Sequence, residues 1–315
     1  MATIKLTVVV PVYNEEAVIQ QFHTRTSGVL DALDGVESEI VYVVDRCTDN
    51  TLGVLRDIAK GDHRATILAL SSRFGHQMSL LAGIEHARNS DCIIMMDSDL
   101  QHPPELIPQL LEPFRAGIDV VYTVRRDTED VSIIRKVLGN LFYRFLGLIS
   151  HVQINANAAD FRLISSRVAN SLSNDFQERN MFLRGLFSWM GFKQASIEYS
   201  AKRRFAGVSK YSSSRMLKLA MAGVLSFSTR PLHLGIFVGV GFAALAFLYM
   251  LVSVVIYFVD RSIPSGWTTL VTLLLLFSGV QLIVMGIIGA YIGGIYEEVK
   301  ARPRYIIEEV ISYHV

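Results

Sequence analysis

The sequence predicts an α/β fold, with a mostly parallel sheet covered by helices on both faces, followed by two membrane-spanning helices. Two observations lead to this prediction. Over residues 4–124, short β-branched and apolar runs alternate with amphipathic stretches, which is the pattern of a parallel sheet between helices. The charges are also unevenly placed. Residues 232–259 and 267–296 contain no Asp, Glu, Lys or Arg, although 19% of the chain is charged.

Five strands and the helices that follow them can be located in the alternating region. The apolar runs cover residues 4–12, 40–45, 65–70, 92–97 and 120–124, and helices are expected to begin near Glu15, Asp49, Gly75 and Pro104. In parallel sheets of this kind, ligands bind beyond the carboxyl ends of the strands. Asn14, Asp45 and Asp97 stand at three of these ends. We therefore expect their side chains to lie on one rim of the sheet.

A different pattern follows the fifth strand. Residues 133–149 are predicted to form a helix whose apolar and aromatic face lies opposite Arg135, Lys136 and Arg144. This arrangement is typical of a helix lying in a membrane interface. An ordinary helix packed on the sheet is the alternative. The interfacial interpretation is favoured because the nearby spans hold this part of the chain against the bilayer.

The two charge-free segments are predicted to span a membrane. Each exceeds the ~20 apolar residues needed to cross a ~30 Å hydrocarbon core. The connector 260–266 is short and contains Pro264 and Gly266, so the spans are expected to form an antiparallel hairpin with both flanks on one side. Basic residues are concentrated in those flanks: Arg203, Arg204, Lys210, Arg215, Lys218 and Arg230 before the first span, and Lys300, Arg302 and Arg304 after the second.

The basic flanks predict the topology and the division of the chain. By the positive-inside tendency, residues 1–230 are expected to form a large cytoplasmic domain, residues 231–297 the hairpin, and residues 298–315 a cytoplasmic C-terminal tail. Residues 1–5 run directly into an apolar strand, so we expect no cleaved signal peptide.

Composition excludes several other classes of protein. Cys47 and Cys92 lie far apart without His partners at ligand spacing, which argues against a disulfide framework and a zinc site. The net charge of +1 offers no argument for nucleic acid as a partner. The basic cluster before the first span instead suits anionic lipid head groups or phosphates.

The stretch Met-Asp-Ser-Asp-Leu-Gln-His-Pro-Pro-Glu, residues 96–105, carries the most chemical information. A buried strand ends in Asp97 and Asp99, and Gln101 follows. Hard oxygen ligands of this kind suit Mg²⁺ or Mn²⁺, particularly when the cation also binds a diphosphate. A solvated loop or a helix cap is the alternative. The preceding strand and the following helix start favour a metal site.

Several motifs together resemble the family-2 glycosyltransferases of GT-A fold over nearly the whole chain. The motifs are Pro-Val-Tyr-Asn-Glu-Glu at 11–16, the stretch at 96–105, Ala-Asp-Phe-Arg-Leu at 159–163 and Gly-Val-Ser-Lys-Tyr at 207–211. The resemblance is closest to the polyprenyl-phosphate branch, which includes bactoprenol glucosyltransferases and dolichyl-phosphate mannose synthases. It implies a Rossmann-like GT-A domain that takes a sugar from a nucleotide-sugar.

The resemblance also implies a set of donor-binding residues. They are Pro11, Tyr13, Asn14, Glu15, Asp45, Arg73, Asp97, Asp99 and Arg125. The second strand departs from the family, because Val44-Asp45-Arg46-Cys47 stands where Asp-Asp-Gly-Ser is usual. Asp45 is still expected to accept a hydrogen bond from the base or ribose, whereas Asp49 is expected to cap the next helix.

Acceptor-side roles are implied for a second set. Asp160 matches the family's acceptor-side carboxylate, although a phosphate monoester is already anionic at pH 7 and hardly needs a general base. Orienting the acceptor, holding Arg162, or forming a structural ion pair are the other roles considered for Asp160. Arg126 and Arg125 are expected near the diphosphate, with a solvated basic loop as the alternative. Arg162, Arg204, Ser209 and Lys210 are expected to bind acceptor phosphate.

These inferences combine into one predicted reaction. A single sugar, with UDP-glucose as favoured donor, moves with inversion to undecaprenyl phosphate, while Asp97, Asp99 and Gln101 hold Mg²⁺ or Mn²⁺. Catalytic roles fall on Asp160, Asp97 and Arg126. Polymer synthesis is disfavoured because processive synthases carry Gln-x-x-Arg-Trp in this region, whereas this chain has Asn180 and no Trp until Trp189.

Three alternatives and two partner expectations complete the prediction. The alternatives are GDP-mannose with dolichyl phosphate, a non-catalytic membrane adaptor on the same fold, and a lipid-flipping transporter. The last is disfavoured because neither span contains a charged residue. Membrane lipids and a homo-oligomer are the expected partners.

Overall fold

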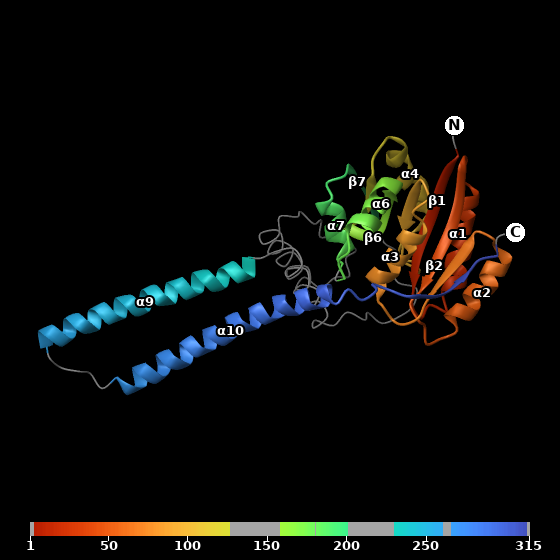
Figure 1. Ribbon diagram of the computed structural model, residues 1–315. Coiled ribbons are helices and arrows are strands. Elements are labelled where there is room, and N and C mark those ends of the chain that lie inside the picture. Colours follow the sequence, from red (N-terminus) through yellow and green to blue (C-terminus); the bar gives the residue numbers. More distant parts are fainter. Residues whose placement is uncertain (1–2, 127–157, 180, 201–229, 261–265, 314–315) are drawn as a thin grey trace. The chain divides into compact units, whose positions relative to one another are not determined.

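The computed structural model describes residues 3–126, 158–179, 181–200, 230–260 and 266–313 (Figure 1). These residues fall into two compact units. The first contains the described residues up to 200 together with residues 302–313, and the second contains residues 230–260 and 266–301. The predicted interfacial helix at 133–149 lies outside the described residues, as do Arg204, Ser209 and Lys210.

The first unit is built on one sheet, which has eight strands within the described ranges. Their order is β7-β5-β6-β4-β1-β2-β3-β8. The strands are β1 (Ile4–Val12), β2 (Val36–Val44), β3 (Ala65–Leu70), β4 (Cys92–Met95), β5 (Val120–Arg126), β6 (Ala158–Ser165), β7 (Gln194–Ser200) and β8 (Ile307–Ile311). Strand β1 pairs in parallel with β2 and β4, and β2 with β3, whereas β6 and β8 are antiparallel to their neighbours. The predicted mostly parallel sheet is confirmed.

Helices cover both faces of this sheet, as predicted. They are α1 (Ile19–Asp31), α2 (Thr51–Gly61), α3 (His76–His86), η1 (Pro104–Leu106), α4 (Ile107–Arg115), α6 (Ser166–Asp175) and α7 (Leu183–Trp189). Helices α1, α2 and α4 bury their apolar side chains in one core with alternate residues of β1, such as Val8 and Val10. Helix α3 packs on the opposite face, where Gly83 lies against the side chains of Val9 and Val43.

Strand β2 begins at Val36 rather than at residue 40, and two boundaries beside the predicted site also differ. Helix α1 begins at Ile19 rather than near Glu15, because Asn14 has a positive φ of 55° and residues 15–18 form a turn closed by Glu15. Strand β4 ends at Met95, because the backbone leaves the sheet before Asp97. Both differences lengthen the loops at the carboxyl ends of the strands, where the predicted site lies.

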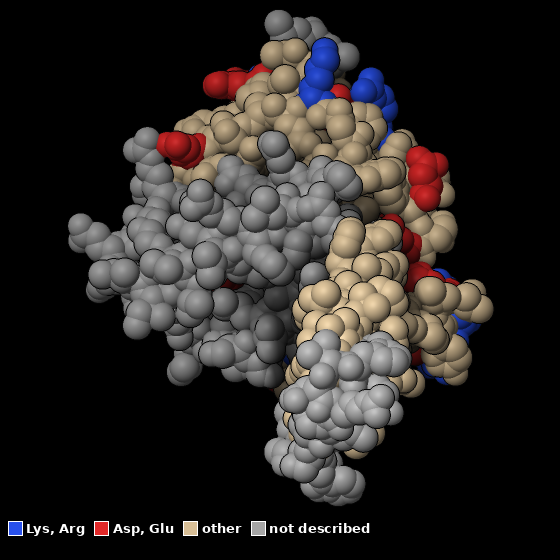
Figure 2. Space-filling model, turned by 90° about the vertical axis from the view of Figure 1, so that its left-hand side faces the viewer, with Lys and Arg blue, Asp and Glu red and all other residues tan. Residues whose placement is uncertain are grey.

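The second unit contains two long apolar helices, α9 (Arg230–Asp260) and α10 (Trp267–Val299). Their most apolar windows are Gly235–Val252, with a mean hydropathy of 2.3, and Leu276–Val299, with 1.8. None of the residues in either window is buried within the chain. No Lys, Arg, Asp or Glu occurs between residues 232 and 259 or between residues 267 and 296. Because only charged residues are blue or red in Figure 2, the described atoms of both segments are tan there. By length and composition both helices could cross a membrane.

The C-terminal residues return to the first unit. Strand β8 pairs antiparallel with β3, so residues 307–311 form an edge strand rather than the simple tail expected from the sequence. Their run of five residues, Ile-Glu-Glu-Val-Ile, is short and does not alternate between apolar and polar side chains. Its pattern therefore does not by itself indicate a strand. The chain on either side of the hairpin therefore belongs to the same folded unit.

Candidate active site

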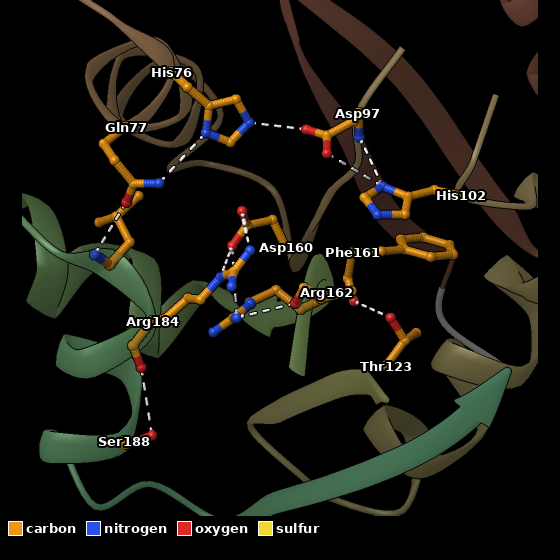
Figure 3. A network of polar contacts seen from close by, with 12 residues as sticks. His76, Gln77, Asp97, His102, Thr123, Asp160, Phe161, Arg162, Arg184 and Ser188 are labelled. Carbon is orange, nitrogen blue, oxygen red and sulfur yellow. Dashed lines mark hydrogen bonds and ion pairs between the residues drawn. The ribbon is translucent and has the colours of Figure 1, made fainter. Parts of the chain in front are cut away.

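Asp97 lies at the centre of a polar network just beyond the end of β4 (Figure 3). Its Oδ1 is 2.8 Å from Nε2 of His76, and about a third of the side chain, 34%, is exposed. Burial raises the pKa of the Asp97 carboxyl, but the adjacent histidines lower it by more, so the net shift is downward. Burial conversely lowers the pKa of His76, and the hydrogen bond and charge of Asp97 raise it by more. The pair therefore favours a carboxylate facing an imidazolium.

His102 supports Asp97 from the other side. The backbone N–H of Asp97 donates to Nδ1 of His102 at 3.0 Å, so this nitrogen must carry a lone pair. Oδ2 of Asp97 lies 3.8 Å from the same nitrogen. The buried His102 ring stacks on Phe161 at 5.3 Å. Its role is to hold the loop that carries the aspartates.

Asp99 and Gln101 form a tight turn next to Asp97. Oδ1 of Asp99 accepts from the backbone N–H of Gln101 at 3.1 Å, and Leu100 between them has a φ of 62°. Asp97 and Asp99 are both partly exposed. No three His, Cys, Asp or Glu side chains converge as a metal cage anywhere in the described chain. Two carboxylates and an amide nevertheless suit a divalent cation that completes its shell with phosphate oxygens and water.

Asp45 does not have the exposure expected of a ligand-binding residue. It is only 4% exposed, and its carboxylate accepts hydrogen bonds from the backbone N–H groups of Phe74 at 2.6 Å and Gly75 at 3.0 Å. Gly75 adopts a φ of 90°, a conformation that glycine tolerates best. Asp45 thus fastens the loop after β3. Its contact with the base or ribose stays a prediction beside this supporting role.

Asn14 is likewise engaged in holding two loops together. Its Nδ2 donates to Oγ1 of Thr48 at 2.9 Å, and its Oδ1 accepts from the backbone N–H of Thr48 at 2.8 Å. Its own N–H contacts Sγ of Cys47 at 3.2 Å. Nearby, Pro11 is buried within β1 and the N–H of Glu15 donates to Thr51. The unusual residues after β2 therefore still form an ordered turn against the end of β1.

Exposed cations lie above this framework. The Arg73 guanidinium lies 4.1 Å from the centre of the Tyr13 ring, and Arg46 donates to the carbonyl oxygen of Ser71 at 2.5 Å. Both arginines are exposed and Tyr13 is partly exposed. An aromatic ring and two guanidinium groups at the carboxyl ends of β1, β2 and β3 could contact a base and its phosphates.

A second charged cluster surrounds Asp160 in β6. Arg184 of α7 donates to both carboxylate oxygens, Nε at 2.6 Å and Nη2 at 2.7 Å. Burial raises the pKa of Asp160, but the Arg184 guanidinium and the nearby Arg162 hold it far below its usual range. Such a carboxylate is a poor proton acceptor at neutral pH. Of the roles considered from the sequence, the ion pair is the one that the structure shows.

Arg162 points into the protein rather than toward a ligand. Its side chain is 5% exposed, lies 4.9 Å from the centre of the Phe187 ring, and donates to the carbonyl oxygen of Ala159 at 3.1 Å. Burial lowers its pKa to about 10. The binding of acceptor phosphate by Arg162 stays a prediction, and in this conformation its guanidinium contacts Ala159 and Phe187. Arg184, with 30% of its side chain exposed, is the more accessible guanidinium.

Gln77 links the two charged clusters. Its Nε2 lies 3.4 Å from Nδ1 of His76, and its Oε1 accepts from the backbone N–H of Leu183 at 3.2 Å. Helix α3 therefore connects the Asp97 loop with the start of α7, which carries Arg184 (Figure 3). The sequence signalled no role for His76, Gln77 and Arg184, because their partners lie in other elements.

For two other predicted site residues, the structure describes the backbone but not the side chain. Arg125 and Arg126 end β5 and pair with Tyr199 and Ser200 of β7, but their side chains are not described. Their place near a diphosphate stays a prediction. Asp49 was expected to cap α2, but the N-cap residue is Asn50; Asp49 lies one residue earlier, and its Oδ1 accepts from the N–H of Thr51.

Comparison with known proteins shows that this chain is similar to glycosyltransferases. The sequence profile of the glycosyl transferase family 2 matches residues 7–173. The uncharacterized glycosyltransferase YkcC of Bacillus subtilis (strain 168) is 39% identical over 306 residues, covering 97% of this chain and 94% of the relative. The bactoprenol glucosyl transferase of Shigella phage SfII is 37% identical over 305 residues, covering 97% of this chain and 98% of the relative.

The solved structures that match are more distant. The glucosyl-3-phosphoglycerate synthase of Mycobacterium tuberculosis, in complex with Mn²⁺, UDP and phosphoglyceric acid, is 19% identical with a TM-score of 0.47. The match covers 71% of this chain and 78% of that one.

Proposed function

Because this chain belongs to glycosyl transferase family 2, we propose that it transfers glucose from UDP-glucose to a polyprenyl phosphate, with undecaprenyl phosphate as the acceptor. The observation that carries this proposal is the extent of the match to the bactoprenol glucosyl transferases. At 97% of this chain, it extends over the two apolar helices as well as the catalytic unit. A lipid-linked acceptor explains why both parts occur in one chain.

The chain path supports a hairpin topology. Residues before α9 and after α10 belong to one folded unit, so a chain that crosses a membrane between them must cross an even number of times. Basic residues in both flanks favour the cytoplasmic side for that unit. We therefore assign the catalytic unit and both ends of the chain to the cytoplasm, where nucleotide-sugars are available.

The reaction needs little proton transfer. An oxygen of the lipid phosphate attacks the anomeric carbon of glucose, and the bond from that carbon to the UDP oxygen breaks as the new bond forms. UDP leaves with the bonding electron pair, and attack opposite the leaving group inverts the anomeric centre. The lipid phosphate is already ionised at pH 7, so the ion-paired state of Asp160 is no obstacle.

The residues of the rim divide into contact and support roles. Asp97, Asp99 and Gln101 would hold Mg²⁺ or Mn²⁺, which when bound neutralises negative charge on the diphosphate. His76 and His102 hold the Asp97 loop in place. Tyr13 and Arg73 are suited to bind the nucleotide, while Asp45 and Asn14 fix the loops around them. The site then acts mainly by positioning and by charge compensation.

Arg184 is the residue we assign to the acceptor side. Its guanidinium is held in one orientation by the bidentate contact with Asp160, and part of it remains exposed. A fixed, planar guanidinium is well matched to phosphate oxygens. Arg204, Ser209 and Lys210 remain predicted phosphate contacts from the segment before α9, and a homo-oligomer remains a prediction.

A transfer assay with the purified full chain tests the function. Protein in lipid nanodiscs is supplied with undecaprenyl phosphate, Mn²⁺ or Mg²⁺, and radiolabelled UDP-glucose, UDP-GlcNAc or GDP-mannose in turn. We expect label in the lipid fraction from UDP-glucose, and a loss of at least about a hundredfold in Asp99→Ala, the scale seen when a single group that stabilises a transition state is removed. Asp57→Ala, on the outer surface of α2, is the matched control and should retain activity.

Two results would count against the proposal. Label transferred to the lipid from GDP-mannose alone would replace glucose by mannose and UDP by GDP. Absence of binding and turnover with every nucleotide-sugar, in a protein that melts cooperatively, would favour the non-catalytic adaptor.

A further inference from the structure

The segment after α10 contacts the loop that carries the candidate donor residues. Strand β8 pairs with β3 as far as Ile307 opposite Leu70, and the pairing continues beyond the strand, because the N–H of Ser71 donates to the carbonyl oxygen of Ile306 at 3.0 Å. Ser71 is the first residue of the loop 71–75, which leads to His76. The C-terminal segment thus holds the start of this loop.

The same segment also holds the helix that follows the loop. Arg304 donates to Oε1 of Glu85 in α3 at 2.6 Å, and the Tyr305 hydroxyl donates to the other carboxylate oxygen. Arg304 also donates to the carbonyl oxygen of Phe176, after α6, at 2.7 Å. The ion pair is largely buried, with 13% of the Arg304 side chain and 20% of the Glu85 side chain exposed. Ion pairs of this kind are costly to break from one side.

Between these two contacts lie the residues that face the site. Arg73 is stacked on Tyr13, and His76 contacts Asp97. The other attachments of the loop come from the end of β2: Asp45 to its C-terminal half, and Arg46 to the carbonyl of Ser71. Loop 71–75 is therefore fixed both from inside the sheet and by the chain that follows the membrane helices.

We propose that residues 304–307 are a positioning element of the donor site, acting on Arg73 and His76 through Ser71 and Glu85. This inference rests on the proposed function, because it assigns these residues to nucleotide binding. The segment lies outside the residues matched by the family profile, 7–173. It follows that donor affinity depends on the chain beyond the second apolar helix. This positioning role, called the anchor below, is a function for the return of residues 302–313 to the sheet.

Two variants and one matched control test the proposal in the full chain in nanodiscs. Arg304→Gln removes the charge that pairs with Glu85, and Tyr305→Phe removes one hydroxyl. Arg56→Gln breaks the exposed ion pair between Arg56 of α2 and Glu309 of β8, which does not involve residues 304–307 or the loop. The probe is UDP with Mn²⁺, measured by calorimetry. We expect roughly tenfold weaker binding for Arg304→Gln, the middle of the usual range of coupling between sites, a smaller loss for Tyr305→Phe, and no change for Arg56→Gln.

Hydrogen exchange in the absence of nucleotide gives a second readout. Backbone amides of residues 71–77 should exchange faster in Arg304→Gln and Tyr305→Phe than in the wild type or in Arg56→Gln. If Arg304→Gln fails to fold, Tyr305→Phe decides the outcome. The proposal is overturned if the folded variants bind UDP like the wild type, if Arg56→Gln weakens binding equally, or if exchange in residues 71–77 is unchanged. A wild type that binds no UDP refutes the proposed function instead, and the exchange measurement still tests the anchor.

Discussion

Replacing Asp160 with Asn removes one negative charge while keeping the shape of the side chain. In the wild type this carboxylate accepts two hydrogen bonds from Arg184, at 2.6 and 2.7 Å, and only 16% of its side chain is exposed. Breaking a buried pair from one side costs about 3–5 kcal/mol, because the remaining charge is left without compensation. Arg162 is also buried nearby, at 3.9 Å from the same carboxylate. We therefore expect Asp160→Asn to lower the free energy of unfolding by about 3 kcal/mol.

The kinetic consequence separates two roles of Asp160. If it acts by orienting Arg184, then Asp160→Asn and Arg184→Gln should each reduce kcat, and the double variant should lose little more than either single one. If Asp160 is a general base, Asp160→Asn should reduce kcat by a factor on the order of 10²–10⁴ and Arg184→Gln by far less. The assay is the lipid transfer reaction, with thermal melting of each variant in parallel. Multiplying losses in the double variant would refute the ion-pair explanation.

Three other changes have defined outcomes. His76→Ala should weaken Mn²⁺ binding about tenfold through the loss of support for Asp97, as measured by electron paramagnetic resonance of free Mn²⁺; unchanged affinity would contradict this. Burial lowers the pKa of His23, so the unfolded chain takes up more protons as the pH falls through the ordinary histidine pKa. The contribution of His23 to stability should therefore decrease from pH 7.5 to 5.5, so the wild type should lose more stability over this interval than His23→Gln; equal changes in the two denaturation midpoints would exclude this cause. Gly83→Ala would place a Cβ atom 2.2 Å from Cγ1 of Val9 and should destabilise the catalytic unit by about 1–3 kcal/mol, whereas Gly28→Ala meets no neighbour and serves as the control in thermal melting.

Local patterns in the sequence were sufficient to predict the architecture. Strands β1 and β3 have the predicted bounds, because continuous β-branched and apolar runs bounded by turn residues occur only where a strand is buried on both faces. The two apolar helices follow from length and the absence of charge. The aspartates after β4 were identified as candidates because a parallel sheet brings the ends of its strands to one rim.

The roles of individual side chains required the folded chain. The sequence suggested only that Asp45 contacts the nucleotide, and the folded chain adds that its carboxylate accepts from backbone N–H groups 29 and 30 residues away. It suggested that Arg162 binds phosphate, but that side chain is buried against Phe187. Both residue types occur as ligand contacts and as structural supports, and the difference lies in solvent exposure, which depends on neighbours in other elements.

The ion pairs that the sequence did not predict join residues far apart in the chain. Asp160 meets Arg184 across 24 residues, and Arg304 meets Glu85 across 219. Periodicity and turn signals report where the backbone forms a strand or a helix, since these depend on residues close in the chain. Which charged side chains form ion pairs depends on how those elements pack. A buried charged group is paired with the oppositely charged group that the packing brings within hydrogen-bond distance.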